Sequence, residues 1–169
     1  MKYQAVVFDL FGTLVDQFYK AEHESLLSEM AMALAAPQRD FAYQWVGTYD
    51  QRATGAFPSL EANIEQICRS LHVNVKAAQI SEAARRMLDF TRQTLLPRPD
   101  AVETLAELRV LGYKIGLISN CSSVVPDLWR ETPSWALLKL ACMRSSFEHP
   151  TKMPMLRVMR NGTGLRFQH

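Results

Sequence analysis

A short apolar run that ends on an acid limits how this chain can fold. Residues 5–8 are continuously apolar and include two valines, the pattern of a strand buried on both faces of a parallel sheet. Asp9 follows directly, and Gly12 and Thr13 come before the chain turns apolar again. Ligands of open α/β sheets bind at the carboxyl ends of the strands. This order therefore predicts that Asp9 faces a ligand and that Gly12 lets the backbone turn close to it.

A long helical stretch separates this run from the next strand. Between residues 17 and 95 apolar residues recur at helical spacing. Pro37, the stretch 55–58 and Asn74 divide the pattern into about four helices. We therefore expect a helical bundle, residues 16–95, inserted directly after the first strand.

A second apolar strand ends on Ser119 and Asn120. If the two strands are parallel neighbours, Asp9 and Ser119 lie side by side at one edge of the sheet. The expected fold class is therefore α/β, with a Rossmann-like parallel sheet as the core. Residues 1–15 and 96–169 are assigned to this core, which the inserted bundle interrupts.

These motifs resemble those of the haloacid dehalogenase-like hydrolase superfamily. Its first motif is a strand followed by Asp-x-x-Gly-Thr, here residues 9–13, and its second is a strand ending in Ser or Thr, here Ser119 followed by Asn120. The helical stretch is similar in place and length to the family's cap. The resemblance implies that Asp9 is a nucleophile that forms a covalent intermediate and that Ser119 hydrogen-bonds the transferring group.

The resemblance also implies a ligand set around these residues. In phosphatase members Mg²⁺ bridges nucleophile and phosphate, which makes Asp9 and the backbone carbonyl of Phe11 its expected ligands. Gly12, Thr13 and Asn120 are expected to contact the substrate.

Two further basic residues are candidates for the site. Lys152 lies 32 residues beyond Asn120, a distance similar to that of the lysine in the family's third motif, which makes it a candidate catalytic residue. Arg52, in a probable cap loop, could bind a substrate anion, with an ordinary solvated arginine as the alternative.

Phe11 leaves the substrate class open. Most phosphatases of the family carry an aspartate there for proton transfer, and losing such assistance costs about 10²- to 10⁴-fold in rate. Dehalogenase members have an aromatic residue there and need no metal, but they also place an arginine beside a cap tryptophan, whereas here Val46 follows Trp45.

Three functions fit this pattern. The first is a Mg²⁺-dependent phosphatase that acts on a small phosphorylated metabolite through an aspartyl-phosphate intermediate. The second is a metal-independent hydrolase of 2-haloacids. The third is a catalytically silent family member or binding protein.

The tail after Thr132 departs from the family pattern. It carries six basic residues against the single acid Glu148, and no aspartate follows Asp127, so the acids that complete the family's metal site are missing. The core is therefore expected to be incomplete at its C-terminus, through divergence, truncation or a frame shift. An uncovered sheet edge would favour self-association.

Composition sets the remaining expectations. The three cysteines form no Cys-x-x-Cys pair, and no apolar run reaches 18 residues. The basic tail lacks the interleaved aromatic residues of a nucleic-acid groove. We expect a cytoplasmic protein with a small-molecule substrate and with neither nucleic-acid nor membrane partners.

Overall fold

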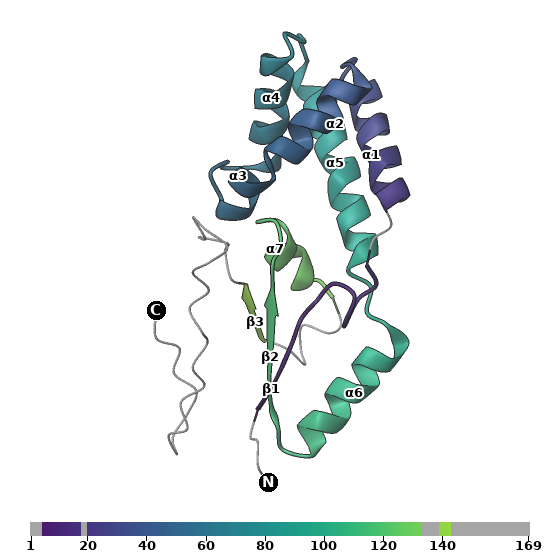
Figure 1. Cartoon of the computed structure of the whole chain (residues 1–169), viewed down its shortest axis with the longest axis vertical. Coiled ribbons are helices and arrows are strands. Elements are labelled where there is room, and N and C mark those ends of the chain that lie inside the picture. The colour runs from purple at the N-terminus through teal and green to yellow at the C-terminus, as the bar shows by residue number, and fades with distance from the viewer. Residues whose placement is uncertain (1–4, 18–19, 133–138, 143–169) are drawn as a thin grey trace.

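The computed structural model describes residues 5–17, 20–132 and 139–142 and shows helices around a parallel sheet (Figure 1). The strands are β1 (Ala5–Phe8), β2 (Lys114–Ser119) and β3 (Lys139–Cys142). They lie in the order β1-β2-β3, and both neighbouring pairs are parallel. The α/β fold predicted from the sequence is confirmed. β3 was not expected, because helical and strand periodicity fade after Thr132.

The register brings the two predicted motifs to the same edge. Phe8 of β1 pairs with Leu117 of β2. Asp9 therefore leaves the sheet beside the last residues of β2, and Ser119 ends that strand opposite Cys142 of β3.

Within the described part of residues 16–95 the structure has five helices, whereas the sequence predicted about four. They are α1 (Lys20–Ala33), α2 (Gln38–Gly47), α3 (Tyr49–Thr54), α4 (Leu60–Ser70) and α5 (Ala77–Thr94). The additional element is α3, a short helix that follows α2 after one residue, Thr48. The Thr48 hydroxyl donates to the carbonyls of Gln44 and Trp45, each at 3.1 Å, and so satisfies carbonyls at the end of α2.

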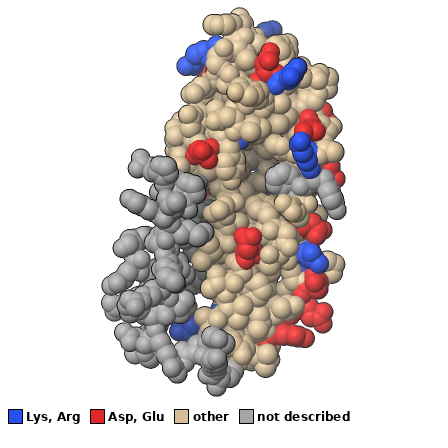
Figure 2. Space-filling model, in the orientation of Figure 1, with Lys and Arg blue, Asp and Glu red and all other residues tan. Residues whose placement is uncertain are grey.

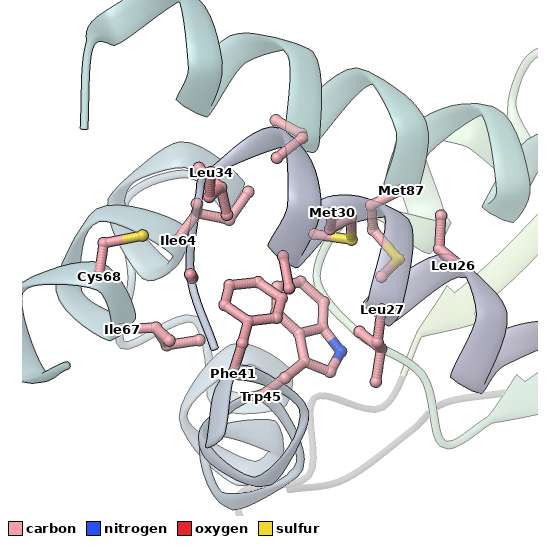
Figure 3. Packing of buried hydrophobic residues seen from close by; sticks show 14 of the residues in the cluster. Leu26, Leu27, Met30, Leu34, Phe41, Trp45, Ile64, Ile67, Cys68 and Met87 are labelled. Atoms are coloured by element: carbon pink, nitrogen blue, oxygen red, sulfur yellow. The ribbon is translucent and has the colours of Figure 1, made fainter. Parts of the chain in front are cut away.

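These helices enclose a hydrophobic cluster of their own, which we call the cap cluster (Figure 3). Phe41 and Trp45 of α2 stack at its centre, with ring centroids 6.1 Å apart and an interplanar angle of 25°. Around them lie apolar side chains from α1, α4 and α5, among them Met30, Ile64 and Met87. Burial of this shared apolar surface holds the helices together.

A second cluster, the core cluster, lies beside the sheet. It joins the loop after β1 to α6 (Pro99–Val110) and α7 (Val125–Trp129), and Leu10, Leu105 and Trp129 are fully buried in it. In Figure 1 α6 runs beside the sheet, while α7 lies between the sheet and the cap helices. Leu88 of α5 packs against both clusters and so connects them.

The surface of the described residues is mixed in charge. Figure 2 shows acidic and basic side chains together along one side of the visible face. No helix in the described part of the chain is long and apolar enough to cross a membrane.

Candidate functional site

The loop after β1 holds Asp9 in a defined place. Leu10 is completely buried and anchors the loop in the core cluster, whereas the Asp9 side chain is exposed. The Leu10 carbonyl accepts hydrogen bonds from the backbone N–H groups of Thr13 at 3.2 Å, Leu14 at 2.9 Å and Val15 at 3.1 Å. This tight turn presents a carboxylate at a strand end, where it can meet a ligand.

Gly12 makes the turn possible. Its φ is +75°, in the left-handed region that glycine adopts without steric cost. Its N–H donates to the Val15 carbonyl at 2.9 Å, which closes the loop. Gly12 and Thr13 are both exposed, while Phe11 is half-buried and packs against the core cluster. The close backbone turn predicted from the sequence is therefore present.

The end of β2 places Ser119 and Asn120 at the same edge of the sheet as Asp9. Ser119 is buried, with 2% of its surface exposed, and the next residue, Asn120, is exposed. Asp9, Ser119 and Asn120 thus meet at the carboxyl edge of the sheet, as their order in the sequence predicts. Their catalytic and binding roles stay predictions.

Arg52 occupies a different environment from the solvated one that the sequence favoured. It is buried, with 8% exposed, and lies over the Trp45 ring with its Cζ atom 4.0 Å from the ring centroid. Its Nη1 donates to the Trp45 carbonyl at 2.7 Å, the Thr48 hydroxyl at 2.6 Å and the Asn63 side-chain oxygen at 3.1 Å. The alternative prediction, that Arg52 is an ordinary solvated arginine, is therefore wrong.

A cavity of about 40 Å³ lies between the cap helices and the loop after β2, and Arg52 is one of its lining residues. From the cap it is lined by Trp45, Arg52, Phe57, Ser59, Leu60, Met87 and Thr91, and from the core by Ser122, Ser123 and Val124. The three core residues closely follow Ser119 and Asn120 in the chain. The cap and the β2 loop therefore build one wall each of the same cavity.

The sequence did not identify Tyr49 and His23 as titratable neighbours of Arg52. The pKa of Tyr49 is raised, first by burial and then by Cys121, so its phenol keeps its proton at neutral pH. The pKa of His23 is lowered, first by burial and then by the Arg52 charge. Tyr49 and Arg52 are three residues apart on α3, and this helical spacing was the signal available in the sequence.

The described residues do not assemble a metal site. Asp9 is the single carboxylate among the metal ligands implied by the family resemblance, and no group of three His, Cys, Asp or Glu side chains suited to a metal occurs in the described ranges. This donor set does not fit a resident Mg²⁺ held by the described residues alone. Lys152 lies outside the described residues.

Known proteins resemble most of the chain. A family described as haloacid dehalogenase-like hydrolase matches residues 3–147. The (S)-2-haloacid dehalogenase 4A of Burkholderia cepacia is 26% identical over 120 residues, which are 69% of this chain and 50% of that protein. The chain thus spans about half the length of this curated relative.

Solved structures of similar proteins include an L-2-haloacid dehalogenase, with 19% identity, a TM-score of 0.44 and coverage of 83% of this chain and 63% of the other. The CbbY protein of Rhodobacter sphaeroides, in complex with xylulose-(1,5)bisphosphate, has 18% identity, a TM-score of 0.44 and the same coverages of 83% and 63%. A predicted phosphoglycolate phosphatase of Haemophilus somnus has 16% identity, a TM-score of 0.39 and coverages of 88% and 66%.

Proposed function

Because this chain belongs to the haloacid dehalogenase-like hydrolase family, we propose that Asp9 is the nucleophile of a two-step hydrolysis. In the first step an Asp9 carboxylate oxygen attacks the substrate, and the leaving group departs with the bonding electron pair. In the second step water hydrolyses the resulting enzyme-bound ester and restores the carboxylate. The exposed position of Asp9 at the strand end, held by the Leu10 and Gly12 turn, supports this role.

The proposed substrate class follows from the side chain of Phe11. A departing halide is a stable anion and needs no proton, whereas the alkoxide released from a phosphate ester does. The phenyl side chain of Phe11 cannot supply that proton. We therefore propose metal-independent hydrolysis of a small 2-haloacid, in which water and the haloacid give a 2-hydroxyacid, a halide ion and a proton. The name of the Burkholderia cepacia relative supports this substrate class.

A phosphatase acting on a small phosphorylated metabolite is the second candidate. The Asp-x-x-Gly-Thr loop and Ser119 favour it, because the resemblance gives the phosphatases of the family the same two motifs. Bound Mg²⁺ would supply charge neutralisation for the phosphate in that case. The sequence motifs favoured the phosphatase over the 2-haloacid hydrolase. We give the 2-haloacid hydrolase priority because Phe11 cannot donate a proton to an alkoxide leaving group.

Four parallel assays of the purified chain test the assignment. The substrates are 2-chloropropionate and glycerol 3-phosphate, whose alkoxide leaving group needs a proton, each with Mg²⁺ and with EDTA. We expect chloride release that EDTA leaves unchanged, and little inorganic phosphate. Mg²⁺-dependent phosphate release without chloride release would instead establish the phosphatase. No turnover of either substrate would favour the silent family member or binding protein.

Replacement of Asp9 by Asn tests the nucleophile directly. The amide keeps the side-chain shape but loses the charged oxygen, so we expect chloride release to fall by at least about 10³-fold. Asp16→Asn is the matched control, because Asp16 is exposed and near the same loop but pairs with Arg98 at 3.8 Å. Turnover of Asp9→Asn within a few-fold of the unmodified protein would contradict the assignment.

A further inference from the structure

The linker that leads from α5 back to the core lies against the turn that carries Asp9 (Figure 1). Val15, in that turn, forms one β-bridge with Phe11 and another, antiparallel, with Pro97 of the linker. Val15 is completely buried, so turn and linker meet within the core cluster. The turn that presents Asp9 is therefore completed by a segment that follows all the cap helices in the chain.

A backbone hydrogen bond fixes this contact. The N–H of Arg98 donates to the Leu14 carbonyl at 2.9 Å. Leu14 is buried, with 3% exposed, and a buried carbonyl that loses its partner is costly. Arg98 is the N-cap of α6, so its own N–H lies outside the hydrogen bonds within that helix. This donor therefore serves the turn rather than α6.

The side chain of Arg98 contributes less to the contact. Its Nε atom lies 3.4 Å from a carboxylate oxygen of Asp100, and its Nη1 atom lies 3.8 Å from one of Asp16. Both carboxylates are largely exposed, and exposed ion pairs of this kind have little effect on stability. The backbone N–H and the side chain of Arg98 can therefore be tested separately.

We propose that Arg98 is a positioning residue for the nucleophile and acts through its backbone N–H. By holding the Leu14 carbonyl, this N–H fixes the end of the turn, and the hydrogen bonds to the Leu10 carbonyl carry that constraint to Asp9. The inference rests on the proposed function, because it takes Asp9 as the nucleophile. A reacting group displaced by about 1 Å can lose roughly 10²-fold in rate, so Arg98 affects turnover without touching the substrate.

Two substitutions separate the N–H from the side chain. Arg98→Ala removes the side chain and keeps the hydrogen bond. Arg98→Pro also removes the N–H and places a ring carbon against the Leu14 carbonyl, while the φ of −62° at this position is one that proline adopts. We expect kcat for 2-chloropropionate to fall by about 10²-fold in Arg98→Pro and to stay within a few-fold in Arg98→Ala. KM should change little in either variant, because the loss concerns the chemical step.

Ile67→Ala is the matched control for lost stability. Ile67 is buried in the cap cluster and belongs to neither the turn nor the linker. It should lower the urea midpoint at least as much as Arg98→Pro, yet leave kcat within a few-fold at a temperature where circular dichroism shows each variant folded. Three results would overturn the positioning role: an equal fall in kcat in Ile67→Ala, an equal fall in Arg98→Ala, or a folded Arg98→Pro as fast as the unmodified protein.

Amide hydrogen exchange, resolved by NMR, tests the contact without turnover. In the unmodified protein the Arg98 amide should be protected to a degree similar to the amides of Leu14 and Val15, because one local opening exposes all three. In Arg98→Pro the protection of Leu14 and Val15 should fall by about three- to tenfold, whereas Arg98→Ala should retain it.

An Arg98 amide that exchanges as fast as an exposed one would overturn the proposal, even if Arg98→Pro does not fold. If the unmodified protein releases no chloride from 2-chloropropionate, the proposed function fails, while the exchange rates still test how the turn is held. The two failures are therefore separate results.

Discussion

At the scale of single residues, Gly12 determines how Asp9 is presented. An added Cβ at Gly12 would find no atom closer than the Gln17 side-chain oxygen at 4.0 Å, so the cost of Gly12→Ala comes from its φ of +75°. We expect a loss of about 1 kcal/mol in the free energy of unfolding, measured by urea denaturation, and a lower turnover as Asp9 moves.

Gly47→Ala is the matched control for this backbone effect. Gly47 is in the last turn of α2 with nothing within 4 Å of the added Cβ, so alanine should raise the free energy of unfolding by about 0.5–1 kcal/mol. If both alanines changed stability in the same direction, the left-handed turn would not be the cause.

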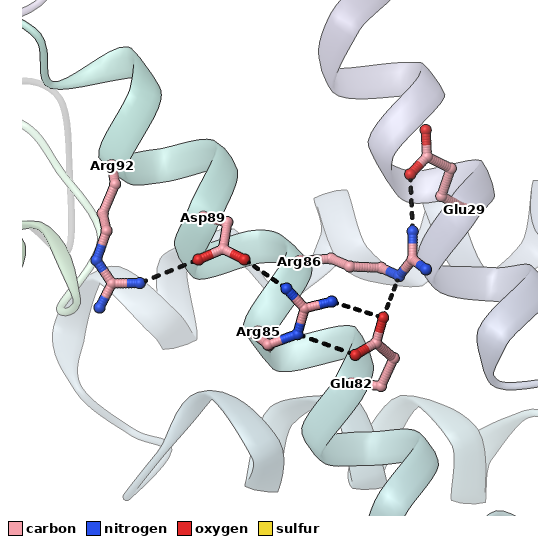
Figure 4. A network of polar contacts seen from close by, with 6 residues as sticks. All are labelled: Glu29, Glu82, Arg85, Arg86, Asp89 and Arg92. Carbon is pink, nitrogen blue, oxygen red and sulfur yellow. Dashed lines mark hydrogen bonds and ion pairs between the residues drawn. The ribbon is translucent and has the colours of Figure 1, made fainter.

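At the scale of elements, a network of ion pairs runs along α5 and connects it to α1 (Figure 4). Glu82 accepts from Arg85 and Arg86, each at 2.9 Å, and Arg86 reaches Glu29 of α1 at 3.0 Å. Farther along α5, Arg92 pairs with Glu131, just after α7, at 3.1 Å. Each exposed pair contributes little alone, but the series links α5 to α1 and to Glu131, just after α7.

Acid should weaken this network. The hydrogen bond from Arg85, followed by the charges of Arg85 and Arg86, lowers the pKa of Glu82 below its ordinary value of 4.5. The stabilising contribution is therefore complete above pH 4.5 and is lost as the pH falls through the lower pKa of the folded state. Glu82→Gln should reduce the fall in melting temperature between pH 6 and pH 3, whereas Glu65→Gln, with a single partner, Arg69, should change it less. Equal acid sensitivity of Glu82→Gln and the unmodified protein would contradict this role.

At the scale of the whole molecule, the two hydrophobic clusters predict two units of stability. Phe41 is fully buried in the cap cluster and Trp129 in the core cluster, and truncating either to alanine should cost about 3–5 kcal/mol. In hydrogen exchange, Phe41→Ala should lower protection mainly in α2 and α4, while Trp129→Ala should lower it mainly in β2 and α6.

Leu88 contacts both clusters and could therefore couple the unfolding of the cap to that of the core. If Phe41→Ala lowered protection equally in α4 and β2, the cap and the sheet would unfold as one cooperative unit, and the two-unit prediction would be wrong. Leu88→Ala should then be the substitution that separates them.

The sequence by itself determined the α/β class and the placement of the candidate residues Asp9 and Ser119 at one edge of the sheet. An apolar run followed by Asp9, a glycine that permits a left-handed turn and a second strand that ends on Ser119 are local patterns, and parallel strands bring their carboxyl ends to one edge. Pattern did not reveal β3 at residues 139–142, because this short strand, unlike β1, is not followed by an acid and a glycine that mark its end.

Only the tertiary structure decided the environment of Arg52. From the sequence alone Arg52 is a charged residue near Gly55, and charged residues are normally solvated. Its burial arises because the end of α2, Asn63 of α4 and the loop after β2 surround it, and these segments are far apart in the chain. The balance between desolvation and hydrogen bonding at such a residue depends on all of these neighbours at once, and so does the small cavity that they leave beside its charge.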